Sequence, residues 1–138
     1  MRYLAIDLGD KRTGLAVGDD VTGLVTPAEQ IAKPAAPGDE LLAGIDAAID
    51  EFGPGALVLG LPLNMDDTEG PRAALVRAFG ERLTQRTGLP VHYQDERLTS
   101  AEANWSMAQS GLTRGQKKNR RDSIAAAAIL RDFLDSAG

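Results

Sequence analysis

The spacing of apolar residues divides the chain into strands and helices. Five segments have the pattern of strands: residues 3–8, 13–18, 24–32, 56–61 and 91–94. The first and fourth are continuous apolar runs, which are typical of strands covered on both faces. The turn at residues 9–12 predicts that the first two strands form a hairpin. Because Pro27 cannot donate to a neighbouring strand, we expect the third strand to begin after it.

Four segments have apolar residues at helical spacing. They are residues 41–52, about 71–88, 99–111 and about 119–136. Gly53-Pro54 and Gly88 end the first two, and Thr99 with Glu102 forms a capping box at the start of the third. Strands that lead into alternating helices and strands predict one α/β domain over residues 1–138, with a mixed sheet and helices on both faces.

Length and composition narrow the class of protein. The chain has 138 residues, the size of one domain, and its 43% hydrophobic and 25% charged residues are ordinary for a globular protein. It has no cysteine, which excludes disulfides, zinc–thiolate sites and thiol nucleophiles. Neither a secretory signal nor an apolar run of membrane-spanning length is present. We therefore expect a cytoplasmic protein without a membrane partner.

Three acidic residues occupy positions where the local pattern favours an apolar side chain. Asp7 lies within the strand pattern YLAIDLG. Asp122 heads the apolar stripe of the last helix, which includes Ile129. Glu96 follows the strand at 91–94, beyond the strand ends, where ligands of α/β sheets usually bind.

Each acid alone has a simple structural explanation. Asp7 fits a buried polar group whose hydrogen bonds are satisfied. Asp122 fits a negative charge at a helix start, which the helix dipole favours, and Glu96 fits a surface acid. Together, however, acids from a first strand, a later strand end and a helix start can converge on one point. Clustered carboxylates repel one another unless a hard cation binds among them. The three acids therefore predict a site for Mg²⁺ or Mn²⁺, ions that support in-line displacement at phosphorus.

A dense basic segment lies within a chain whose net charge is −5. Residues 113–121 contain no acid and five bases: Arg114, Lys117, Lys118, Arg120 and Arg121. A solvated loop is the simpler interpretation of such a run. Its position directly before Asp122 instead favours contact with a phosphate backbone.

Four segments occur in this order: AIDLGDKRTGLAV (residues 5–17), LVLGLPLNMDDTEGPRA (57–73), VHYQDERLTSAEA (91–103) and KKNRRDSIAAAAIL (117–130). Taken together, they resemble the YqgF, or RuvX-like, family. Members of the family are described as Holliday-junction resolvases or as nucleases that mature the precursor of small-subunit ribosomal RNA. Gly18 and Asp67 depart from the family's usual residues, serine and glycine, and neither is a predicted metal ligand.

The resemblance implies a ribonuclease-H-like fold with a five-stranded mixed sheet. It also implies that Asp7, Glu96 and Asp122 are catalytic acids that bind metal, the same three acids that the local patterns select. Basic residues at family motif positions would face phosphate: Lys11, Arg12 and Arg97.

The function expected from residues and resemblance together is a metal-dependent endonuclease for structured nucleic acid. Its main expected role is maturation of the 5′ end of 16S ribosomal RNA, with ribosomal precursor particles as partners and a monomer or weak homodimer as the active form. One alternative is a Holliday junction resolvase acting on branched DNA. More distant alternatives are a nucleotide phosphotransferase of the actin and sugar-kinase type, suggested by the turn from Asp7 to Gly14, and a non-catalytic adaptor.

Overall fold

The computed structural model describes residues 1–9, 12–32, 38–64, 66, 68–95 and 121–137. In chain order the elements are β1 (Arg2–Leu8), β2 (Thr13–Asp19), β3 (Val25–Ile31), α1 (Asp39–Phe52), β4 (Ala56–Leu61), α2 (Pro71–Thr87), β5 (Val91–Asp95) and α5 (Arg121–Ala137). All five predicted strands are present, together with three of the four predicted helices. The predicted helix at 99–111, with its capping box at Thr99 and Glu102, lies outside the described residues.

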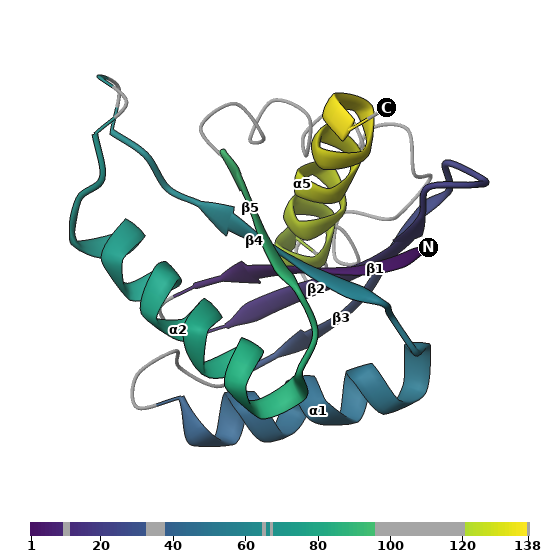
Figure 1. Ribbon diagram of the computed structural model, residues 1–138, viewed down its shortest axis with the longest axis horizontal. Coiled ribbons are helices and arrows are strands. Elements are labelled where there is room, and N and C mark those ends of the chain that lie inside the picture. Colours follow the sequence, from purple (N-terminus) through teal and green to yellow (C-terminus); the bar gives the residue numbers. More distant parts are fainter. Residues whose placement is uncertain (10–11, 33–37, 65, 67, 96–120, 138) are drawn as a thin grey trace.

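The strands form one mixed sheet in the order β3-β2-β1-β4-β5 (Figure 1). β1, β2 and β3 pair antiparallel, whereas β4 pairs parallel to β1 and β5 parallel to β4. The central strand β1 therefore has a hydrogen-bonded partner on each side. The helices α1 and α2 lie in the connections that lead into the two parallel strands, as parallel pairing requires. The predicted five-stranded mixed sheet is confirmed.

The third strand differs from the prediction at its start. β3 begins at Val25 and includes Pro27, although we expected a strand that begins after the proline. β3 is the last strand in the order of the sheet, and Pro27 pairs with Ala16 beside a shift of register between Gly14 and Ala16. An edge strand with an irregular register tolerates a proline, because the missing N–H removes no regular ladder bond.

Glycines set the ends of α1 and α2. Gly53 and Gly88 have φ angles of 62° and 73°, in the left-handed region, and their N–H groups donate to the carbonyl oxygens of Ile49 and Thr84. Pro71 occupies the first turn of α2, where a missing N–H costs no helical bond. These ends agree with the predicted ones. Among the helices in the described ranges, none is long and apolar enough to cross a membrane.

Alternate residues of β1 divide the core between the two faces of the sheet. Leu4 and Ile6 belong to one apolar cluster with buried residues of α1 and α2. These two helices lie on the side of the sheet opposite α5 (Figure 1). Ala5 faces α5 and packs in a second cluster with Ala126 and Ile129, which are fully buried. Helices therefore cover both faces, and the apolar stripe predicted for the last helix is confirmed.

The last helix, α5, packs across the strands on one face of the sheet (Figure 1). In its second half, the ring centroid of Phe133 lies 5.3 Å from that of Tyr3 and 5.2 Å from that of His92. Nearer its middle, Ala126 shares the cluster of Ala5, two residues further along β1. The second half of α5 therefore packs near the start of β1.

Candidate active site at the carboxyl end of β1

Asp7 is the predicted acid that the structure describes in full. It lies near the carboxyl end of the central strand, on the face covered by α5, and its side chain is half-buried. Its partner on β2 is Gly14, and on β4 Gly60 directly follows Leu59, the partner of Ile6. Because both glycines lack a side chain, neither neighbouring strand adds one beside the Asp7 carboxylate.

The carboxyl ends of β4 and β5 lie at the same edge of the sheet as that of β1. Gly60 pairs with Gln94 and Leu61 pairs with Asp95, the half-buried last residue of β5. The predicted acid Glu96 is the next residue in the chain and lies outside the described residues.

The third predicted acid belongs to the first turn of α5. Arg121 and Asp122 are the first two residues of that helix, and their side chains are outside the description. Of the elements that carry or precede the three acids, the structure brings the carboxyl ends of β1 and β5 to one edge of the sheet. Within the described part of the chain, no group of three or more Asp, Glu, His or Cys side chains is arranged to hold a metal ion. The three-acid cluster itself therefore stays a prediction.

Of the predicted phosphate-binding residues, the structure describes the side chain of one. Arg12 is exposed and directly precedes β2 in the turn that follows Asp7. The other predicted basic residues fall outside the described side chains: Lys11, Arg97, Arg114, Lys117, Lys118, Arg120 and Arg121.

Two polar residues at this edge were missed by sequence reasoning. Arg72, in the first turn of α2, donates from Nη2 to the carbonyl oxygen of Leu8 at 3.3 Å. Gln30 pairs with Gly14 and so lies on the α5 face, and its Nε2 is buried without a hydrogen-bond partner among the described residues. Both positions depend on strand register and on how a distant helix crosses the sheet. No local pattern in the sequence could have selected them.

The connection from β4 to α2 leaves the same edge (Figure 1). Leu63 and Glu69 form a β-bridge within it, and the Asn64 N–H donates to the Thr68 carbonyl oxygen at 2.8 Å. The Thr68 hydroxyl also donates to the Asp66 carboxylate at 2.6 Å, which holds the pKa of Asp66 below its usual value. Local hydrogen bonds therefore join the described residues of this connection to one another.

An ion pair joins this connection to α2, and a cation–π contact joins α2 to β5. The Arg77 guanidinium donates from Nε and Nη2 to the two Glu69 carboxylate oxygens, at 2.6 and 2.8 Å, and thereby lowers the pKa of Glu69. The same guanidinium lies 4.9 Å from the centre of the Tyr93 ring, a cation–π contact. Burial raises the pKa of the Tyr93 hydroxyl. Because Tyr93 lies two residues before Asp95, this contact links the end of β5 to α2.

Solved structures share the fold. Thermus thermophilus RuvC in complex with a Holliday junction substrate matches with a TM-score of 0.61 and 15% identity, over 99% of this chain and 96% of that chain. RuvC-like resolvases have a ribonuclease-H-like fold, so the predicted fold is confirmed. A ROK hexokinase from Thermus thermophilus gives a TM-score of 0.50 at 21% identity over 77% of this chain, but only 39% of the hexokinase is covered.

Sequence comparisons identify the family. A relative from Anaeromyxobacter sp. (strain Fw109-5), named "Putative pre-16S rRNA nuclease", is 43% identical over 98% of this chain and 97% of its own length. The RuvX family, described as Holliday junction resolvase, matches residues 1–136. Because both similarities extend over nearly the whole chain, this protein belongs to the RuvX family.

Proposed function

We propose that this protein is a nuclease that hydrolyses phosphodiester bonds of structured nucleic acid, and that its substrate is the precursor of 16S ribosomal RNA. The observation that carries the proposal is the full-length similarity to a relative named as a pre-16S rRNA nuclease. The position of Asp7 supports it, because a half-buried carboxylate at the carboxyl edge of an α/β sheet lies where such folds bind ligands.

Asp7, Glu96 and Asp122 form the proposed catalytic and metal-binding set. The described surroundings of Asp7 fit a hard cation, because a carboxylate offers the oxygen ligands that Mg²⁺ prefers and the flanking residues Gly14 and Gly60 are small. When bound, Mg²⁺ or Mn²⁺ would activate water and stabilise charge on the phosphoryl oxygens. The chain's own part would be to hold these carboxylates together against their mutual repulsion.

The proposed basic residues would hold the nucleic-acid backbone at this edge. Arg12 is exposed and directly precedes β2, and in the sequence the basic segment that ends at Arg121 directly precedes Asp122. Phosphate contacts of this kind position a substrate without reading its sequence, and their strength falls as salt rises.

Parallel cleavage assays test the proposed function. A 16S precursor RNA and a four-way DNA junction are each incubated with wild-type protein in Mg²⁺, in Mn²⁺ or in EDTA. We expect cleavage of the RNA with metal and none in EDTA. Asp7→Asn and Asp122→Asn should stay folded and lose cleavage, whereas the control Asp135→Asn, at an exposed position of α5, should cleave normally.

Melting temperatures provide a second measurement. Metal bound only by the folded state stabilises it by mass action, so Mg²⁺ or Mn²⁺ should raise the midpoint of wild type but not of Asp7→Asn. Full cleavage by a pure Asp7→Asn protein would contradict the proposed catalytic site. A midpoint raised by ATP with Mg²⁺, with the nucleic acid left intact, would indicate a phosphotransferase. Nucleic-acid or protein binding that neither substitution alters, without cleavage, would indicate an adaptor.

The description of the family favours a second candidate, resolution of Holliday junctions. Cleavage of the four-way junction at symmetric positions, with the RNA left intact, would favour it. The proposed acids would be the same for either substrate.

A further inference from the structure

We propose that Gln30 is a substrate-binding residue, whose side-chain amide donates to a sugar or phosphate oxygen of the nucleic acid held at Asp7. This inference rests on the proposed function, since its ligand is the backbone of the same nucleic acid. Gln30 is the residue before the last of β3, and β3 runs in the same direction as β1, because each is antiparallel to β2. Gln30 therefore lies at the same edge of the sheet as Asp7.

Strand register places Gln30 and Asp7 in one row across the sheet. Gly14 of β2 pairs with Asp7 on one side and with Gln30 on the other. Side chains of directly paired residues project from the same face, so Gln30 lies on the face of Asp7. The next residue, Ile31, packs in the apolar cluster of the opposite face, as alternation along a strand requires. Because Gly14 has no side chain, β2 places none between the carboxylate and the amide in this row.

The amide nitrogen of Gln30 is a buried donor without an acceptor. Nε2 is buried and makes no hydrogen bond to a described residue, although the residue as a whole is only half-buried. A buried amide that lacks a partner destabilises a fold, and native proteins rarely keep one unless water or a ligand satisfies it. Within the described ranges, the other such atom is the Thr13 hydroxyl oxygen. Thr13 pairs with Leu8 and so lies on the opposite face, away from Asp7.

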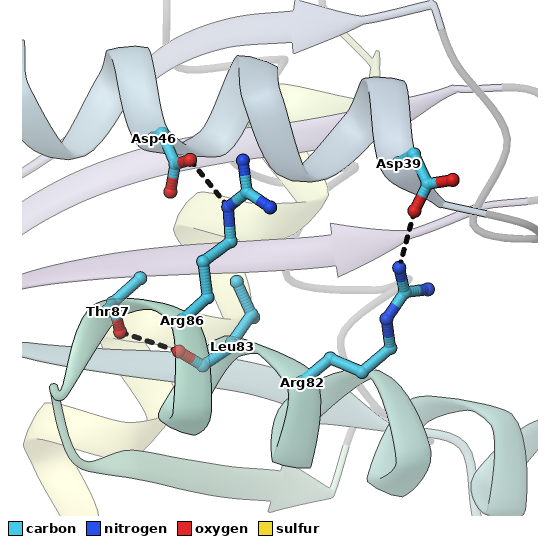
Figure 2. Close-up of polar contacts among 6 residues, drawn as sticks. All are labelled: Asp39, Asp46, Arg82, Leu83, Arg86 and Thr87. Carbon is cyan, nitrogen blue, oxygen red and sulfur yellow. Dashed lines mark hydrogen bonds and ion pairs between the residues drawn. The ribbon is translucent and has the colours of Figure 1, made fainter.

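Polar side chains elsewhere in the molecule have partners even where they are exposed to water. Figure 2 shows two exposed ion pairs between α2 and α1. Arg82 donates to Asp39 at 2.8 Å, and Arg86 donates to Asp46 at 2.6 Å. The buried amide of Gln30, which has more to gain from a partner, has none among the described residues. This contrast favours a partner that comes from the substrate.

The position of Gln30 indicates which part of the substrate it meets. Two strand spacings, about 10 Å, separate β3 from β1, so a nucleic acid bound at Asp7 can bring a neighbouring sugar or phosphate to Gln30. Glutamine side chains donate to these backbone oxygens in nucleic-acid complexes. A neutral amide displaces no counterion, however. Its contact should therefore add affinity without adding to the salt dependence that cationic residues such as Arg12 produce.

A structural role for Gln30 makes a different prediction for stability. Gln30→Met keeps a side chain of similar length and removes the amide. Loss of an unsatisfied buried donor should leave the melting midpoint unchanged or raise it, whereas loss of a structural hydrogen bond should lower it. Gln85→Met is the matched control, because it makes the same change at an exposed residue of α2, on the other side of the sheet (Figure 1). Gln30→Glu is a second variant, which keeps the shape and adds a negative charge.

Binding is measured by fluorescence anisotropy in EDTA, over a series of salt concentrations, with a labelled stem-loop of the 16S precursor RNA and with the same sequence as DNA. We expect Gln30→Met to bind the RNA about tenfold more weakly than wild type, as loss of one hydrogen bond to a charged group implies. Gln30→Glu should bind more weakly still, because its carboxylate repels phosphate. The slope of log affinity against log salt should be unchanged in Gln30→Met, and Gln85→Met should bind as wild type does.

The DNA assigns the oxygen that the amide meets. A similar loss with RNA and DNA would assign a phosphate oxygen, and a loss with RNA alone would assign the ribose 2′-hydroxyl, which DNA lacks. Wild-type affinity in Gln30→Met or in Gln30→Glu would overturn the proposal. A lower melting midpoint of Gln30→Met would also overturn it, since Gln30 would then be structural. So would a reduced salt slope, which would show that cationic contacts had been displaced.

The role of Gln30 and the proposed function can fail separately. Loss of cleavage in Asp7→Asn together with normal binding by Gln30→Met would reject the role of Gln30 and leave the nuclease site intact. Persistent cleavage by Asp7→Asn together with weakened binding by Gln30→Met would reject the catalytic proposal and leave Gln30 as a nucleic-acid contact.

Discussion

Gly80 is a buried residue of α2 at the point where the Tyr93 side chain packs against the helix. A Cβ built on Gly80 would collide with the Tyr93 hydroxyl oxygen. It would also lie 3.0 Å from both Cζ of Tyr93 and Cδ1 of Leu59, tighter than ordinary contacts. We therefore expect Gly80→Ala to destabilise the protein, although alanine is the better helix former.

Two opposing effects set the magnitude. Replacing glycine by alanine inside a helix gains about 1 kcal/mol. Overpacking a well-filled core costs about 1–3 kcal/mol. The net loss in the free energy of unfolding should be roughly 1 kcal/mol, which lowers the melting temperature by a few degrees in a domain of this size.

The phenylalanine variant of Tyr93 tests the cause. Tyr93→Phe removes the colliding oxygen and, with it, only a long hydrogen bond of 3.4 Å to the Arg77 carbonyl oxygen. In that background Gly80→Ala should become neutral or stabilising, and urea unfolding of the four proteins should give a coupling energy of about 1 kcal/mol. The reasoning is refuted if Gly80→Ala stabilises the protein that keeps Tyr93.

Two further predictions concern the edge that carries the site. Arg77 lowers the pKa of Glu69, so the pair stabilises the fold above the ordinary Glu value of about 4.3 and loses this effect as pH falls through the lower folded value. Glu69→Gln should therefore melt below wild type at pH 7, and the difference should vanish in acid; a difference that does not depend on pH would contradict this reading. A Cβ on Gly9 would collide with the carbonyl oxygen of Arg12, so Gly9→Ala should lose about 1–3 kcal/mol in urea unfolding and also cleave more slowly, and unchanged stability would show that the turn can shift freely.

The parts of the fold that local pattern determines could be predicted from sequence. Continuous apolar runs located β1 and β4, and glycines at left-handed positions ended α1 and α2 where expected. The predicted start of β3 after Pro27 was wrong, because the effect of a proline depends on whether its strand lies at the edge of the sheet. That position is a property of the whole sheet. Strand order and register arise from pairings between distant residues, which a local window does not contain.

The same division applies to the site. Asp7 could be selected because a carboxylate in an apolar strand conflicts with its own surroundings, and that conflict is visible locally. Arg72 could not, because an arginine at the start of an amphipathic helix looks like any solvated charge. Its contact with Leu8 joins residues 64 positions apart and depends on the crossover between β1 and α2.

The division of the core between two faces has a consequence for the nascent chain during synthesis. Every described strand and both helices of one face are synthesised before α5, so among the described elements the helix that buries Ala5 and its neighbours on the other face emerges last. The same helix carries Asp122, the last of the proposed acids. Burial of that face and completion of the acid set therefore coincide. A nascent chain that lacks α5 therefore lacks both the helix that buries Ala5 and one of the three proposed acids.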